Sequence, residues 1–300
     1  MEININPDIL SDISANMGRI KLSQKYNISD ELARFYIKLV DYDKPIEKLE
    51  DVNIVLFDIE TLPIESYTWG LYKQNISINQ IKRDMCLLSY SYKTLHSKYI
   101  YGDILTPGEA VKRDDKRIVE GLWQVFDNAD VVIAHNGDKF DIRVSNSRFL
   151  KHGMRLPSSY RTIDTLKAVR QRFKLTSNKL DYIAQYLEVG RKIDTTFNLW
   201  KGCSDGDKKS LKQMLKYNKM DVEVLENVYL EIRGYIKNHP ILGNITDNNN
   251  CPVCGSSRLV NDGYYYTKLG KYDAYYCPKC KAVLHNRTNL NRGNKNLRIS

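Results

Sequence analysis

The order of the apolar segments between residues 52 and 240 most constrains what this chain can fold into. The predicted strands, in chain order, lie at 53–58, 85–93, 97–103, 129–136 and 159–165. Helical periodicity occupies 114–129 and 140–153, and again 165–174, 178–187 and 207–235. Three neighbouring strands followed by β-α-β-α units predict an α/β domain, with a mixed sheet flanked by helices.

The first predicted strand, within NIVLFDIET, ends in two acids, Asp58 and Glu60. Residues i and i+2 share one face of a strand, so the two carboxylates would lie side by side and repel. A cation between them would relieve that repulsion. A solvated strand end before Pro63 is the simpler interpretation of this pair taken alone.

Two further acids lie where predicted elements begin or pack. Asp141 falls in the first turn of the helix at 140–153, where the helix dipole alone would favour a carboxylate. Tyr217 and Asp221 are four residues apart on the last helix, on the apolar stripe that continues through Leu225 and Val228. A buried aspartate needs a partner, and a metal ion is one candidate.

The motifs FDIET, HNGDKFD and YNKMD, in this order, resemble those of the DnaQ-like (DEDD) 3′–5′ exonucleases, which include polymerase proofreading domains. The resemblance covers residues 52–235 approximately. Residues 162–187 also look like phage and bacterial ribonuclease H-like members, including the YprB-like group. Lys216 stands where the histidine branch has its histidine, which favours the tyrosine branch. The resemblance implies a ribonuclease H-like sheet.

The resemblance also implies a site for two Mg²⁺ or Mn²⁺ ions about 3.5–4 Å apart that hydrolyses phosphodiester bonds. Tyr217 would position the attacking water or help to deprotonate it. The expected metal ligands are Asp58, Glu60, Asp141 and Asp221, and the expected nucleic-acid contacts are Thr61, Leu62 and Asn136. Trp69 and Tyr72 would stack on bases or, alternatively, belong to the core.

Four of the six cysteines form two CxxC motifs separated by 22 residues. This spacing predicts a tetrahedral structural Zn²⁺ site with no open position. The segment between the motifs reads as a β-hairpin with its turn around 269–273, and the module resembles the zinc ribbons of transposase-like proteins. The expected zinc ligands are Cys251, Cys254, Cys277 and Cys280, whereas Cys86 is expected in the core and Cys203 has no assigned role.

The formal net charge of +10 is concentrated near the C-terminus, where residues 236–300 hold ten Lys or Arg and three Asp, giving +7. A basic segment with interleaved tyrosines favours nucleic acid as a partner. The expected contacts in the ribbon are Tyr265, Lys268, Lys271 and Arg287. Ordinary solubility charge, with tyrosines that merely cover a small zinc core, is the alternative.

The predicted organisation has four parts. Residues 1–42 are a helical segment with a possible DNA-binding helix-turn-helix, in which Ser29 would cap the second helix. The remaining parts are the exonuclease domain at 52–240, the zinc ribbon at 250–288 and a basic tail at 289–300. We find no signal peptide and no run of 18 apolar residues, so we expect a cytoplasmic protein of a bacterium or a phage-infected host, with no membrane partner.

The sequence thus predicts a metal-dependent 3′–5′ exonuclease, with DNA the favoured substrate. A ribonuclease or a structure-specific nuclease would use the same site. A nucleic-acid-binding adaptor that has kept a nuclease fold is the third alternative. Because these 300 residues contain no polymerase domain, proofreading would need a partner, such as a replication or recombination protein.

Overall fold

The structure is a computed structural model that describes residues 7–14, 19–29, 32–33, 52–191, 195–237, 239–240, 250–256 and 258–291. The chain divides into two compact units. One comprises 1–50 with 246–248, and the other comprises 51–245 with 249–300. Each unit is described by itself.

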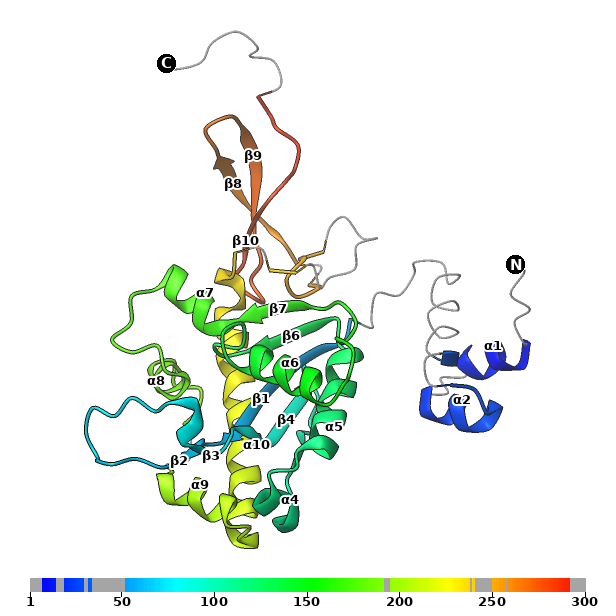
Figure 1. The fold of residues 1–300 in the computed structure, drawn as a ribbon. Coiled ribbons are helices and arrows are strands. Elements are labelled where there is room, and N and C mark those ends of the chain that lie inside the picture. Colours follow the sequence, from blue (N-terminus) through cyan, green and yellow to red (C-terminus); the bar gives the residue numbers. More distant parts are fainter. Residues whose placement is uncertain are drawn as a thin grey trace. The chain divides into compact units, whose positions relative to one another are not determined.

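The larger unit is built on a five-stranded mixed sheet in the order β5-β4-β1-β6-β7 (Figure 1). Its strands are β1 (Ile54–Leu62), β4 (Cys86–Thr94), β5 (Tyr101–Ile104), β6 (Val131–Ala134) and β7 (Arg161–Asp164). The central strand β1 is antiparallel to β4 and parallel to β6. The predicted ribonuclease H-like mixed sheet is therefore confirmed.

Helices cover both faces of this sheet. The long α10 (Lys208–Ile232) packs on one face with α7 (Thr165–Arg172) and α8 (Leu180–Tyr186), whereas α5 (Lys116–Asp127) and α6 (Asp141–Lys151) cover the other. Two short helices, α4 (Pro107–Lys112) and α9 (Phe197–Ser204), were not predicted from the sequence. They pack against each other, and α9 also packs against α10.

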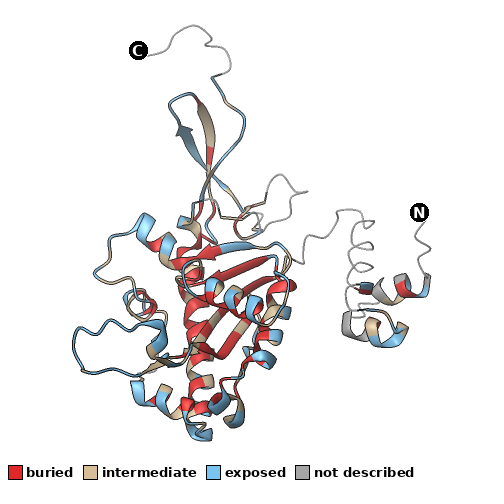
Figure 2. Cartoon of the chain, in the orientation of Figure 1, coloured by how far each residue is buried: buried red, intermediate tan, exposed pale blue. Residues whose placement is uncertain are grey.

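Strand β1 separates two hydrophobic clusters because its side chains alternate between the faces of the sheet. Ile54 and Leu56 pack with residues of α8 and α10. Val55 and Phe57 pack toward α5 and α6, where the rings of Phe57 and Phe126 meet edge to face with centroids 4.7 Å apart. Figure 2 shows the sheet as the most continuously buried part of the molecule. The even-numbered face of β1 is thus the one that meets α10.

The C-terminal module contains a second, antiparallel sheet in the order β10-β9-β8. The predicted hairpin is present as β8 (Val260–Tyr266) and β9 (Lys271–Tyr276), with its turn slightly earlier than expected, and β10 (Val283–His285) adds a third strand. The module contacts the end of α10, where Lys281 Nζ lies 3.0 Å from a carboxylate oxygen of Glu231. Gly234 lies so close to this module that an added Cβ would be 2.2 Å from the carbonyl oxygen of Cys280.

The smaller unit contains α1 (Pro7–Ser14) and α2 (Arg19–Tyr26). The chain turns at Asn27, whose φ is 47°, and Ser29 Oγ accepts a hydrogen bond from the Leu32 backbone N–H at 3.1 Å, as expected of an N-cap. The rest of the predicted second helix, the segments 43–51 and 241–249, and the basic tail beyond 291 lie outside the described residues. In the part of the chain that the structure describes, no helix is long and apolar enough to cross a bilayer.

Candidate functional site

Three of the predicted carboxylates meet at the interface of β1 and α10. One oxygen from each of Asp58, Glu60 and Asp221 lies within 4.8 Å of the other two. Asp58 and Glu60 continue the even-numbered face of β1, which packs against α10 through Leu56 and its neighbours, so the same alternation that buries the core aims both acids at Asp221. Asp221 is only 2% exposed, whereas Asp58 and Glu60 are half-buried. Like charges this close to one another favour a bound cation.

Asp141, at the start of α6, contacts strand β1 through the backbone of Ile59. The pairing of β1 with β6 covers only Ile54 to Leu56, so β1 runs on beyond its parallel neighbour. In that gap the backbone N–H of Ile59 donates to Asp141 Oδ1 at 3.4 Å. Asp141 is in the first turn of α6 and is 5% exposed. It therefore borders the acids on β1 but is outside the group of three whose oxygens all lie within 4.8 Å of one another.

Tyr217 stands one turn before Asp221 on α10, close to the acids. Burial raises the pKa of its hydroxyl, and the charges of Asp221, Glu60 and Asp58 and a hydrogen bond to Asp221 raise it further. The ring also packs edge to face on Trp200 of α9, with centroids 6.2 Å apart. A helix that sequence periodicity missed therefore helps to place this tyrosine.

Asn218 is a site residue that sequence reasoning missed. Its side chain is fully buried, and Nδ2 donates to Asp58 Oδ2 at 2.7 Å. Its own Oδ1 accepts a hydrogen bond from Ser89 Oγ on β4 at 3.2 Å. Asn218 therefore orients one carboxylate oxygen of Asp58 and ties α10 to the sheet. The sequence feature that could have indicated Asn218 is its place next to Tyr217, as a polar residue on the apolar face of the helix.

The register of β1 against β4 shifts between Glu60 and Thr61. Bulges of this kind re-aim side chains and often border active sites. The shift follows Glu60 directly, so it changes the direction of the chain as it leaves the acids. Thr61 is half-buried just past the shift, and Leu62 is fully buried in the core.

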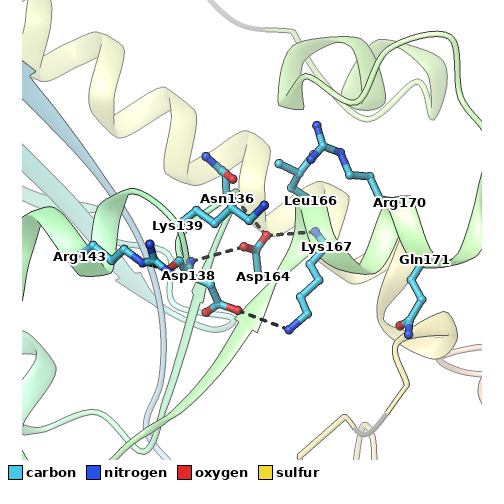
Figure 3. A pocket seen from close by; sticks show the side chains of 9 residues that line it. All are labelled: Asn136, Asp138, Lys139, Arg143, Asp164, Leu166, Lys167, Arg170 and Gln171. Carbon is cyan, nitrogen blue, oxygen red and sulfur yellow. Dashed lines mark hydrogen bonds and ion pairs between the residues drawn. The ribbon is translucent and has the colours of Figure 1, made fainter.

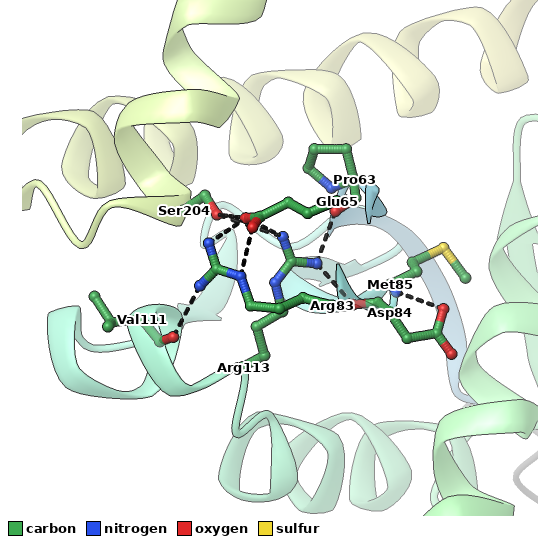
Figure 4. Close-up of polar contacts among 8 residues, drawn as sticks. All are labelled: Pro63, Glu65, Arg83, Asp84, Met85, Val111, Arg113 and Ser204. Carbon is green, nitrogen blue, oxygen red and sulfur yellow. Dashed lines mark hydrogen bonds and ion pairs between the residues drawn. The ribbon is translucent and has the colours of Figure 1, made fainter. Parts of the chain in front are cut away.

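A partly buried ionic clamp holds the chain just beyond β1. Glu65 pairs with Arg83, whose Nε is 2.6 Å away, and with Arg113, whose Nη2 is 2.8 Å away, and it accepts a hydrogen bond from Ser204 Oγ at 2.9 Å (Figure 4). Arg113 also donates to the carbonyl oxygen of Pro63 at 2.7 Å. Burial alone would raise the pKa of Glu65, but the hydrogen bonds from Arg83, Ser204 and Arg113 lower it to about 2.

The clamp fixes the base of an exposed apolar loop at 67–80. Trp69 is 98% exposed and Tyr72 is 85% exposed, so the alternative that they are core aromatics is wrong. Leu71 and Ile78 are similarly exposed. Several large apolar side chains on one anchored loop thus face solvent.

The loop that follows β6 carries two further residues of interest. Asn136 is half-buried with φ of 69°, and its backbone N–H donates to Asp164 Oδ1 at 3.0 Å. Phe140, which precedes Asp141, is 42% exposed, and sequence reasoning gave it no separate role. Asp164 is the last residue of β7 and the N-cap of α7.

The four predicted zinc ligands lie together in the C-terminal module. The Sγ atoms of Cys251 and Cys280 are 3.6 Å apart, and those of Cys254 and Cys277 are 3.7 Å apart. Tetrahedral coordination at a Zn–S distance of about 2.3 Å requires sulfurs roughly 3.8 Å apart, so the four thiols fit zinc. Cys86 and Cys203 are buried in the core of the main domain.

Aromatic and basic side chains gather on the hairpin of this module. Tyr264 and Tyr266 are more than half exposed, and Lys271 Nζ lies 3.5 Å from the centroid of the Tyr264 ring. Tyr265 stacks on His285 with centroids 4.3 Å apart. Lys268 and Arg287 are exposed.

A match to a family model agrees with this architecture. The family model described as the RNase_H superfamily matches residues 55–232. Among solved structures, the family B DNA polymerase from the hyperthermophilic archaeon Pyrobaculum calidifontis matches with 16% identity and a TM-score of 0.44, over 60% of this chain and 24% of that one. No curated protein matches. With more than half of its length matched by the family model, the chain belongs to the RNase_H superfamily.

Proposed function

We propose that this protein is a metal-dependent nuclease that removes nucleotides from the 3′ end of a nucleic acid, with DNA as the favoured substrate. The observation that carries the proposal is the meeting of Asp58, Glu60 and Asp221 oxygens within 4.8 Å across β1 and α10. Membership of the RNase_H superfamily supports nucleic acid as the general class of substrate.

The donor set suits a hard divalent cation. Carboxylate oxygens are the ligands that Mg²⁺ and Mn²⁺ prefer, and there is no thiol or imidazole in the group of three. When bound, such ions would offset the charge of a phosphodiester and lower the pKa of a water molecule. Asp58, Glu60 and Asp221 would hold them, with Asp141 as the fourth ligand of a two-ion site.

Other residues of the protein would hold the metal ligands and the attacking water in a fixed orientation. Asn218 holds Asp58 in one orientation, and the Ile59 amide holds Asp141 against β1. Tyr217, braced by Trp200, would orient the attacking water. We assign Thr61, Asn136 and the backbone at Leu62 to contacts with the terminal nucleotide, since the Leu62 side chain is buried.

Binding beyond the site would come from two aromatic surfaces. Trp69 and Tyr72 on the loop at 67–80 are free to stack on unpaired bases, since their rings face solvent. In the C-terminal module, Tyr265, Lys268, Lys271 and Arg287 would contact the strand, and one structural Zn²⁺ on the four cysteines would hold the hairpin that carries the first three.

A panel of oligonucleotides labelled at either end tests the function. With Mg²⁺ or Mn²⁺, we expect stepwise shortening from the 3′ end, and Asp58→Ala should abolish it while the thermal melt stays cooperative. The panel includes single-stranded, duplex and forked DNA and RNA, so it also separates an RNase or a structure-specific nuclease from a DNA exonuclease. Binding without cleavage of any member, with metal bound, would contradict the proposal and favour the adaptor alternative.

A further inference from the structure

A basic pocket lies beside the loop that leads to Asp141. Its volume is about 530 Å³, and its walls come from the β6–α6 loop, the first turn of α6 and α7 (Figure 3). Four cationic side chains line it, against two carboxylates, so its formal charge is +2. The cations are Lys139, Arg143, Lys167 and Arg170.

Neither carboxylate makes a close ion pair with a cation of the pocket. Asp164 is committed to backbone amides, accepting from Asn136 at 3.0 Å, from Lys167 at 3.1 Å and from Asp138 at 3.4 Å. The carboxylate of Asp138 makes a long contact of 4.0 Å with the Lys167 ammonium group, and the carbonyl oxygen of Asp138 accepts from Arg143 Nε at 3.1 Å. Within the described part of the chain, no ion pair or hydrogen bond is made by the side-chain ammonium group of Lys139 or by the guanidinium group of Arg170, whereas the Lys139 backbone N–H donates to the carbonyl oxygen of Asn136 at 3.1 Å.

The wall that carries these cations is preformed. Gly137 packs so tightly on β6 that a Cβ there would be 2.5 Å from the Cβ of Ala134. Asn136 adopts a left-handed conformation, and the three hydrogen bonds that backbone amides donate to the Asp164 carboxylate join the loop to the start of α7. Lys139 therefore sits on a fixed loop, two residues before the candidate ligand Asp141.

We propose that this pocket binds internal phosphodiester groups of the strand whose 3′ end lies at the acids. The inference rests on the proposed function and deepens it, because it makes the substrate an extended strand and not a mononucleotide. Exposed Lys and Arg side chains around a concave, rigid surface suit phosphate oxygens, and Leu166 is the only apolar lining residue. Internal phosphates are chemically the same whatever the neighbouring bases, so we expect binding in this pocket to be independent of base sequence.

Binding is tested in an Asp58→Asn background, which avoids chelators that would also strip zinc. The probe is a fluorescent single strand about 12 nucleotides long, within the usual range of such footprints. A plot of log affinity against log salt concentration has a negative slope. In the Lys139→Gln/Arg170→Gln variant, the magnitude of this slope should fall by about 0.7 for each phosphate that the variant no longer neutralises. Lys112→Gln/Lys151→Gln, which removes two exposed cations outside the pocket, is the matched control and should leave the slope unchanged.

Two comparisons make the result specific. Strands with and without a 5′-phosphate should lose affinity equally, and a loss confined to the 5′-phosphorylated strand would overturn the proposal by identifying a terminal monoester as the ligand. The pocket variant with Asp58 intact should lose more efficiency on the strand than on the p-nitrophenyl ester of thymidine 5′-phosphate, which has no second nucleotide. Equal losses on both would also overturn it.

The outcome separates the pocket from the proposed function. A wild-type protein that cleaves nothing, together with a pocket variant that loses salt-dependent binding, refutes the nuclease and leaves the pocket standing. A wild-type protein that degrades strands, together with a pocket variant that matches the Lys112/Lys151 control, refutes the pocket alone.

Discussion

Replacing Asn218 by alanine tests the structural account of the site, because no sequence motif pointed to this residue. The change removes the donor to Asp58 Oδ2 and the acceptor for Ser89 Oγ. A hydrogen bond to a charged group contributes about 1.5–3 kcal/mol, and the loss of residues that orient metal ligands weakens metal binding about 10–100-fold. A tenfold change corresponds to about 1.4 kcal/mol, so the two magnitudes agree.

The assay is the dependence of strand degradation on Mn²⁺ or Mg²⁺ concentration. For Asn218→Ala, we expect the half-saturating concentration to rise about 10–100-fold, with partial recovery of activity at high metal. Asn227→Ala is the control, because Asn227 lies on the same helix and donates to the carbonyl oxygen of Val189 at 3.0 Å. It should cost about 0.5–1.5 kcal/mol of stability and leave the metal dependence unchanged. An Asn218→Ala protein with wild-type metal dependence would refute the orienting role.

Four other expectations follow from the described contacts. Because the pKa of Glu65 falls from 4.5 to about 2 in the fold, its ionic stabilisation is present above pH 4.5 and is lost as the pH falls toward 2; the difference in Tm between wild type and Glu65→Gln should therefore shrink over that window. Zinc analysis should find one ion per chain, and chelation should speed hydrogen exchange at 251–285 while β1 stays protected. Trp69→Ala should change stability by less than about 0.5 kcal/mol but weaken single-strand binding by about 1–3 kcal/mol, as measured by fluorescence anisotropy. Asp58→Asn should melt higher than metal-free wild type, since it removes one charge from a repelling cluster, and a lower melt would contradict the electrostatic reasoning.

The order of elements and much of the site could be predicted because they depend on local patterns. Alternation along residues 54–60 specifies which side chains share a face, and the spacing of Tyr217 and Asp221 specifies one face of a helix. Two CxxC motifs bring thiols together through their own turns. The helices α4 and α9 escaped prediction because they are short and their apolar faces pack mainly on each other and on α10.

The sequence by itself determined which carboxylates and thiols were available and on which face of each element they lie, because periodicity and motif spacing are properties of the local chain. Only the tertiary structure decided that β1 runs past β6, so that the Ile59 amide is left for Asp141. It also decided that Asn218 meets Asp58 across 160 positions of sequence, and that Trp69 faces solvent. The physical reason is that packing between distant elements sets burial and hydrogen-bond partners, and no local pattern encodes which elements will meet.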